Sequence, residues 1–255
     1  MDKEKLKDLL EEFKHGDKST EEVMGKLEEL PFKDIGYAKI DTHRDLRRGA
    51  PEAIYCEGKT EDQVLEILDE MYPEDEVIAT RVDGGTLEVI DEKYEEAHVY
   101  PDARVAFVGS YPKETLGKIS VITAGTTDIP VAKKSEVTAR SMGVKVDPIY
   151  DVGVSGLHRV ISYRERIDGA DMAVVVAGME GALPSVVSGL VSTPIVAVPT
   201  KVGYGANLDG ISPLLTMLNT CSPGVTVVNI GDGYGAGYFA ASTIRGIKGG
   251  DDPTP

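Results

Sequence analysis

The feature that most constrains the fold is a series of five short apolar runs in the second half of the chain. They are ISVITAG, VKVDPIY, MAVVVAG, PIVAVPT and VTVVNIG, between residues 119 and 231, and helix-length segments separate them. Valine, isoleucine and alanine dominate the runs without clean alternation, which is typical of parallel strands buried on both faces. This rhythm predicts an α/β fold, a three-layer, doubly wound parallel sheet.

Ligands of such sheets bind beyond the carboxyl ends of the strands, which meet at one edge. The runs here are followed by segments rich in glycine, threonine and acidic residues, at 124–128, 151–154, 178–181, 199–207 and 231–233. We therefore expect the functional site at that edge, although glycine after a strand is often only turn geometry.

The first 100 residues differ in texture, because they hold most of the 43 acidic residues. Leucine spacing predicts a helix over 3–15, and a capping box at Ser19 and Glu22 begins a second helix. Thr60 is the expected N-cap of a helix over 61–72, and VIATRVDGGTLEVID predicts a hairpin around Asp83-Gly84-Gly85. The predicted domains are a small α+β domain over 1–100, a linker over 101–117, the α/β catalytic domain over 118–248 and a disordered tail over 249–255.

Composition argues against several classes of partner. A net charge of −16 disfavours nucleic acid and anionic membranes. There is no window of membrane-spanning length, no apolar signal core and no disulfide framework, so we expect a cytoplasmic protein. We expect no metal centre and no tightly bound organic cofactor, whereas Mg²⁺ bound with substrate phosphates is compatible with the sequence.

The loop after the first run is a candidate phosphate site. Gly125, Thr126 and Thr127 precede a predicted helix, whose N-terminus offers free amides and a favourable dipole. The loop lacks a Walker lysine and could be purely structural. The later GDGYGAG resembles a dinucleotide fingerprint, but it follows the last strand, so it predicts a turn and helix packing.

Ionisable residues mark further candidates. Glu180 follows an apolar run, where a carboxylate is costly without a partner or a task. His158 lies early in a predicted helix and could equally be a surface residue. Arg44, Arg47 and Arg48 form either an anion site or an exposed basic loop.

Cysteine is rare in this chain. Cys221 lies between a predicted helix and the last apolar run, whereas Cys56 is expected to be a small buried residue of the N-terminal domain. A thiol at a helix–strand junction is a candidate nucleophile if its surroundings favour the thiolate.

Residues 118–247 resemble the aminoimidazole ribonucleotide (AIR) carboxylase, or PurE, family. The resemblance is carried by ITAGTTDIPVA, GLHRVI, STPIVAVPT and DGISPLLTMLN. A longer resemblance, over 35–247, is to the LarB family, the pyridinium-3,5-biscarboxylic acid mononucleotide synthases. It is carried by DTHRDLRRGAPEAIYCEGKT, GLHRV, GMEGALPSVVSGL, TKVGYGA and LNTCSPGVTVVNIGDGYGAG. Thr220-Cys221 stands where the purine enzymes have Met-Pro, and Ala182 stands where they have histidine.

The LarB resemblance implies a two-part reaction on nicotinic acid adenine dinucleotide. CO₂ carboxylates carbon 5 of the pyridinium ring, and hydrolysis of the phosphoanhydride releases AMP. The product is a precursor of the nickel-pincer nucleotide cofactor. An electron-poor pyridinium cannot attack CO₂, so a thiolate from Cys221 would first add at carbon 4 and make carbon 5 an enamine nucleophile.

The resemblance also implies the other roles. Glu180 would accept the thiol proton, and Asp128 or His158 would take the carbon 5 proton. Thr126, Thr127, Lys201 and Asn207 would hold phosphate or ribose, and Arg44, Arg47 and Arg48 would neutralise a carboxylate or the pyrophosphate. A homo-octamer is the expected assembly. Two alternatives stay open: an AIR carboxylase of purine biosynthesis, and a non-catalytic nucleotide sensor.

Overall fold

The computed structural model describes residues 3–28, 30–43, 49–113 and 115–248. The chain forms two units, which divide after Ser110 and are described separately below. Within the described residues no helix is long and apolar enough to cross a membrane.

The first unit begins with the two predicted helices, α1 (Lys3–His15) and α2 (Thr20–Glu28). The capping box is present, because Ser19 Oγ accepts the Glu22 amide at 3.2 Å and the Glu22 carboxylate accepts the Ser19 amide at 2.7 Å. A two-stranded antiparallel ladder follows, formed by β1 (Lys33–Asp34) and β2 (Lys39–Ile40).

A four-stranded mixed sheet forms the rest of this unit, in the order β3-β4-β6-β5. β3 and β4 are parallel and the other pairs are antiparallel. Its elements are β3 (Glu52–Tyr55), α4 (Glu61–Met71), β4 (Val77–Thr80), α5 (Gly84–Lys93), β5 (Ala97–Tyr100), η1 (Pro101–Ala103) and β6 (Val105–Val108). As predicted, Thr60 caps α4, where it forms a capping box with Gln63.

Two expectations for this unit are corrected. The hairpin around residues 83–85 is wrong: Asp83 is the N-cap of α5, and its side chain accepts the Thr86 amide at 3.1 Å. The expected linker over 101–117 is shorter, because Val105–Val108 is a fully buried strand that pairs with β4 and β5. The expected tail over 249–255 lies outside the described residues.

The second unit contains the five predicted strands in one parallel sheet, in the order β11-β10-β9-β7-β8. The strands are β7 (Lys118–Thr123), β8 (Lys145–Ile149), β9 (Met172–Ala177), β10 (Ile195–Pro199) and β11 (Val225–Val227). The helices are η2 (Thr126–Asp128), α6 (Ile129–Ser141), η3 (Val154–Gly156), α7 (Leu157–Ser162), α8 (Arg164–Asp168), α9 (Leu183–Ser188), η4 (Gly205–Gly210), α10 (Ile211–Leu218) and α11 (Gly233–Lys248). The α/β, doubly wound class is confirmed.

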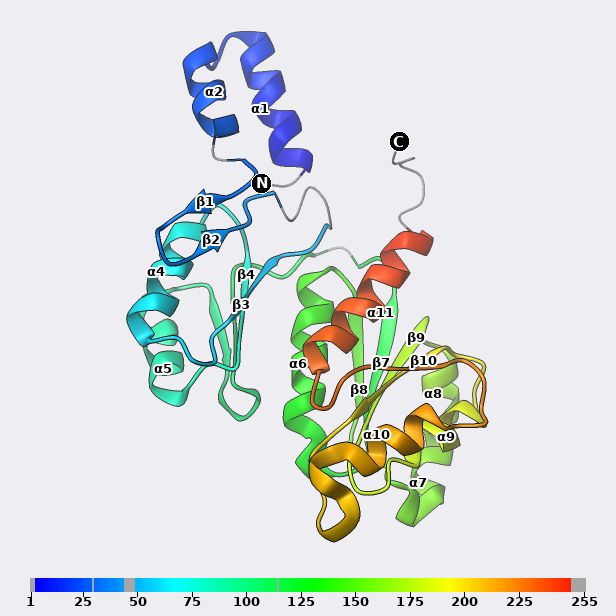
Figure 1. Ribbon diagram of the computed structural model, residues 1–255. Helices are drawn as coiled ribbons and strands as arrows, with labels where there is room; N and C mark the ends of the chain where they lie inside the picture. Colours follow the sequence, from blue (N-terminus) through cyan, green and yellow to red (C-terminus); the bar gives the residue numbers. More distant parts are fainter. Residues whose placement is uncertain (1–2, 29, 44–48, 114, 249–255) are drawn as a thin grey trace. The chain divides into compact units, whose positions relative to one another are not determined.

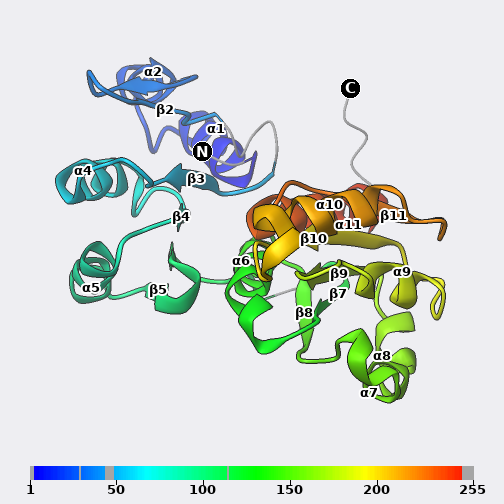
Figure 2. The ribbon, with the colours of Figure 1, turned by 60° about the horizontal axis from the view of Figure 1, so that its bottom comes forward.

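Helices cover both faces of this sheet (Figures 1 and 2). On one face, Ala173 and Val175 of β9 join a core with Val160, Leu183 and Met217, which come from α7, α9 and α10. The alternate residues of β9 point to the other face, where α6 and α11 pack. The GDGYGAG segment opens α11, and two of its glycines lie against the α6 backbone, so the expected helix packing is confirmed.

Candidate functional site

The strand order places a topological switch point between β7 and β9 in the second unit. β7 leads outward to β8 on one side, and β9 leads to β10 and β11 on the other. Loops that leave the carboxyl ends of two such strands diverge and open a crevice between them. The loops here are residues 124–128 after β7 and residues 178–182 after β9.

Asp128 lies beneath this edge of the sheet and is 2% exposed. One carboxylate oxygen accepts the Thr200 hydroxyl at 2.8 Å, and the other accepts the Gly125 amide at 3.1 Å. Burial raises the pKa of Asp128, and hydrogen bonds from Thr200, Gly125 and Gly178 oppose that shift. The carboxylate therefore ties the loop after β7 to the ends of β9 and β10.

The substitution Asp128→Asn tests whether folding raises the pKa of Asp128. Because folding raises the pKa of Asp128, the native state keeps the carboxyl proton to a higher pH than the unfolded chain does. In the unfolded chain an aspartate titrates at about 3.9. The stabilising contribution is thus present at low pH and lost as the pH rises through the folded pKa. We expect the difference in unfolding free energy between the wild type and Asp128→Asn to shrink from pH 4 to pH 7, as measured by urea unfolding.

Asp168→Asn is the matched control. Asp168 is exposed, and hydrogen bonds from the Ser192 amide and hydroxyl lower its pKa. A lowered pKa gives the opposite sign, so the difference for Asp168→Asn grows with pH. A constant or growing difference for Asp128→Asn would contradict the raised pKa.

Glu180 is exposed in the turn between β9 and α9. Its neighbours Met179 and Gly181 both have left-handed backbones, with φ of 52° and 74°. Non-glycine residues in this region are strained and persist only where surrounding contacts hold them. Asn207 supplies one such contact, because its amide nitrogen donates to the Met179 carbonyl at 3.0 Å.

Asn207 itself is buried, at 6% exposure. Its amide nitrogen also reaches the Val202 carbonyl at 3.3 Å, and its amide oxygen accepts the Gly210 amide at 2.8 Å. Both ends of the side chain are therefore engaged by the protein's own backbone. Asn207 therefore joins the 200–210 loop to the turn of Glu180.

Other candidates at this edge are open to solvent. Thr126 and Thr127 are exposed in η2, and Lys201 is exposed directly after Thr200. His158 is exposed at the start of α7, which follows β8. Beside it, Arg159 donates to the Asp151 carbonyl at 2.7 Å and to its carboxylate at 3.0 Å. Arg44, Arg47 and Arg48 lie outside the described residues.

Cys221 is an exposed free cysteine in the loop from α10 to β11. This loop enters β11 at its amino end, whereas the loops of Asp128, Glu180 and Lys201 leave the carboxyl ends of their strands. By topology Cys221 is therefore not one of the strand-end residues. Hydrogen bonds instead join its loop to α9, because Thr220 Oγ1 lies 2.8 Å from Ser185 Oγ.

Comparison with known proteins identifies both units. Residues 32–110 match the family described as the LarB/PurE-like N-terminal domain, and residues 118–248 match the AIR carboxylase family. An uncharacterised protein of Methanocaldococcus jannaschii is 37% identical over 246 residues, which cover 92% of this chain and 95% of that protein. The chain belongs to the LarB family.

Further similarities of this LarB family member cover about half of the chain. The N5-carboxyaminoimidazole ribonucleotide mutase of M. jannaschii is 31% identical over 116 residues, covering 44% of this chain and 68% of that enzyme. The crystal structure of Treponema denticola PurE is 18% identical with a TM-score of 0.43, covering 51% of this chain and 80% of that one. The sequence match to AIR carboxylases supports a carboxylase-type function.

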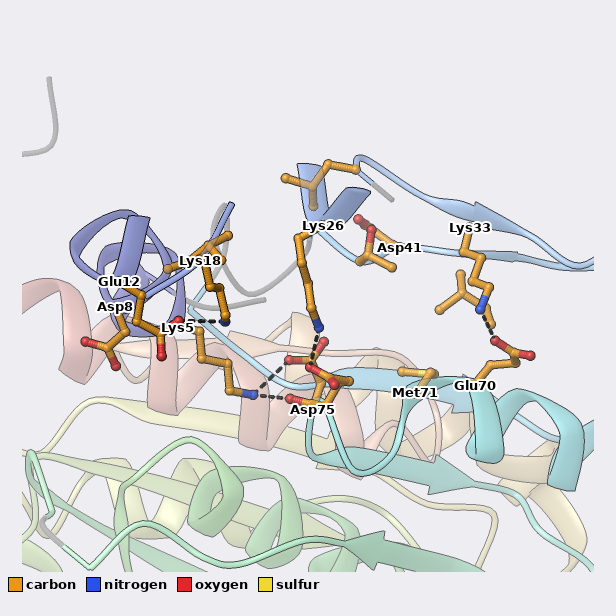
Figure 3. Close-up of a pocket in the computed structure, with 15 residues that line it drawn as sticks. Lys5, Asp8, Glu12, Lys18, Lys26, Lys33, Asp41, Glu70, Met71 and Asp75 are labelled. Carbon is orange, nitrogen blue, oxygen red and sulfur yellow. Dashed lines mark hydrogen bonds and ion pairs between the residues drawn. The ribbon is translucent and has the colours of Figure 1, made fainter. Parts of the chain in front are cut away.

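The first unit of this LarB chain holds a charged cavity of about 380 Å³ (Figure 3). Four lysines line it, and each meets an acidic partner. Lys18 pairs with Glu12 at 2.6 Å, Lys26 with Glu74 at 3.4 Å and Lys5 with Asp75 at 3.3 Å, while Lys33 pairs with Glu70. Asp8 and Asp41 line the cavity too, so six acidic residues face four lysines that are each held in an ion pair. This excess of negative charge does not suit an anionic substrate.

Sequence reasoning missed two hydroxyl residues that hold loops in place. Thr200 donates a hydrogen bond to Asp128, and Ser185 is hydrogen-bonded to Thr220 in the loop of Cys221. Thr200 ends an apolar run and Ser185 lies within a motif quoted for the LarB resemblance, so both stood in marked segments. Their importance comes from partners at distant positions, Asp128 and Thr220, which local patterns do not reveal.

Proposed function

We propose that this LarB family member carboxylates carbon 5 of the pyridinium ring of nicotinic acid adenine dinucleotide and hydrolyses its phosphoanhydride, with release of AMP. The observation that carries the proposal is an exposed cysteine, Cys221, on an AIR carboxylase-type unit. An aminoimidazole is already an enamine and needs no thiol to attack CO₂, whereas a pyridinium ring does.

The chemistry balances without an oxidant or a reductant. The Cys221 thiolate forms a bond to carbon 4, and the ring electrons move to the nitrogen. Carbon 5 then attacks CO₂, a base removes the carbon 5 proton, and the thiolate leaves with its electron pair to restore the aromatic ring. The net change replaces a hydrogen by a carboxylate and releases one proton.

Within this proposal Glu180 is the acceptor of the thiol proton, and its carboxylate is exposed and free to take part in acid–base chemistry. Its turn follows the carboxyl end of β9, whereas the loop of Cys221 precedes the amino end of β11, so the proposed transfer requires the two loops to come together in the assembled enzyme. Exposed His158 remains the candidate for the carbon 5 proton. Asp128 is better suited to holding the loops, since both of its oxygens are engaged. Thr126, Thr127 and Lys201 remain available to phosphate or ribose.

Two further parts of the proposal concern partners. Mg²⁺ would accompany the substrate phosphates, since it binds phosphate oxygens through an open water shell. Association of copies is supported by an exposed apolar stripe on α10, formed by Ile211, Leu215 and Leu218. The assembly we propose is a homo-octamer.

The deciding experiment offers both substrates to the purified protein. With nicotinic acid adenine dinucleotide, bicarbonate and Mg²⁺, we expect AMP and a ring carboxylate, detected by mass spectrometry. Turnover of aminoimidazole ribonucleotide instead would favour the second candidate, an AIR carboxylase, which the AIR carboxylase match supports. A dinucleotide that raises the melting temperature without reacting would indicate a sensor.

A further inference from the structure

The loop that carries Cys221 is fastened to α9 at one serine, Ser185. Ser185 Oγ lies 2.8 Å from Thr220 Oγ1, and Ser222 Oγ donates to the Ser185 carbonyl at 3.2 Å. Thr220 Oγ1 also accepts the Ser222 amide at 3.2 Å. Both chain neighbours of Cys221 are therefore hydrogen-bonded to Ser185.

The same face of α9 makes a further hydrogen bond to the loop of Cys221, one helical turn after Ser185. Ser188 Oγ donates to the Pro223 carbonyl at 2.9 Å. The opposite side of the helix is anchored, because Leu183 and Val187 are buried in the core beneath the sheet. The serine hydroxyls thus attach an irregular loop to a fixed helix.

Helix α9 lies between the turn of Glu180 and the loop of Cys221. α9 begins three residues after Glu180, whose turn is held at the other side by Asn207. A short helix packed into the core therefore joins the turn of Glu180 to the loop of Cys221. A change in the attachment of the loop shifts the thiol while the turn of Glu180 stays in place.

We propose that Ser185 is a positioning residue for Cys221, an inference that rests on the proposed function. A single neutral hydrogen bond contributes only a small part of the stability of a folded unit, so its removal leaves the unit folded. Covalent catalysis, by contrast, requires the sulfur close to the attacked carbon, and a misplacement of about 1 Å can cost about 100-fold in rate. Ser185 therefore matters far more for turnover than for folding.

The test compares three substitutions in the full-length protein. Ser185→Ala is expected to lower kcat about 10- to 100-fold with KM for nicotinic acid adenine dinucleotide changed less than about twofold. Ser185→Thr keeps the hydroxyl and is expected to restore most of the rate. Ser242→Ala is the matched control, since it removes one comparable hydrogen bond, to the Phe239 carbonyl, in α11. It is expected to leave kcat unchanged.

Hydrogen exchange supplies a readout that needs no substrate. Amides of residues 219–222 and 224 are expected to exchange at least about threefold faster in Ser185→Ala than in the wild type or Ser242→Ala. Unchanged exchange, wild-type kcat in Ser185→Ala, or failure of threonine to rescue would each overturn the role of Ser185. A wild-type protein inactive on the dinucleotide would instead contradict the proposed function, so the two failures are distinguishable.

Discussion

Replacing Cys221 with serine is expected to lower carboxylation of nicotinic acid adenine dinucleotide by at least about 1,000-fold. A cysteine is a few per cent thiolate at neutral pH and strongly nucleophilic, whereas a serine hydroxyl is almost entirely protonated and needs an activating base. Without the sulfur adduct, carbon 5 keeps the electron deficiency of the pyridinium ring. The measurement is the initial rate of ring-carboxylate formation at saturating substrate, followed by mass spectrometry.

Cys56→Ala is the matched control for the loss of a thiol. Cys56 is buried in the first unit, and burial raises its pKa to about 11, so it carries almost no thiolate at neutral pH. We expect its kcat to stay within about twofold of the wild type, because a protonated, inaccessible thiol is inert. Equal rates for Cys221→Ser and the wild type would remove the covalent step, and a large loss in Cys56→Ala would mean that the other thiol reacts.

Binding must be separated from chemistry in the same experiment. Cys221 is exposed on its loop, so Cys221→Ser is expected to keep the fold and the dinucleotide-induced rise in melting temperature. Loss of that rise together with the rate would show that the substitution disrupts binding, and the rate alone would then say nothing about a covalent adduct.

The sheet of the second unit could be predicted because its strands are marked by composition alone. Runs such as Met172–Ala177 are buried along their whole length, so their apolar residues do not alternate. The order of the strands depends on how the helices cross the sheet, and no single apolar run encodes it. The switch point between β7 and β9 follows from that order, so it could not be predicted either.

The error at residues 83–85 has a physical cause. Aspartate followed by glycine suits a tight hairpin turn, but aspartate is equally a strong helix N-cap. The deciding factor is non-local: β4 pairs with β3 and β6, so the chain after Arg81 is not needed as a hairpin partner. Asp83 then accepts the Thr86 amide and starts α5.

The strand-end edge could be predicted from the sequence, whereas the place of Cys221 at the amino end of its strand and the roles of the edge residues could not. The family resemblance implied that Asp128 takes a substrate proton and that Asn207 holds phosphate or ribose. The structure engages both inside the protein, through Thr200 for the first and the carbonyl of Met179 for the second. A polar residue's role depends on whether its hydrogen bonds are already made, which is a tertiary property.

The second large effect is expected in the packing of α11 on α6. Gly237 lies so close to α6 that an added Cβ would stand 2.4 Å from the Ser135 carbonyl oxygen and 2.9 Å from the Ser135 Cα. Gly233, on the same face, contacts the Val131 carbonyl in the same way, and the Ser135 hydroxyl donates to the Gly233 carbonyl at 2.8 Å. The glycines thus permit a backbone contact that no side chain could occupy.

Gly237→Ala is therefore expected to destabilise the second unit by at least about 2 kcal/mol, because two helix backbones must separate against a packed core. Gly246→Ala is the matched control in the same helix, since an added Cβ there meets nothing within 4 Å. Alanine is the better helix former, so this variant is expected to gain up to about 1 kcal/mol. Urea unfolding followed by circular dichroism measures both, and a Gly237→Ala variant as stable as Gly246→Ala would show that the two helices are not in backbone contact.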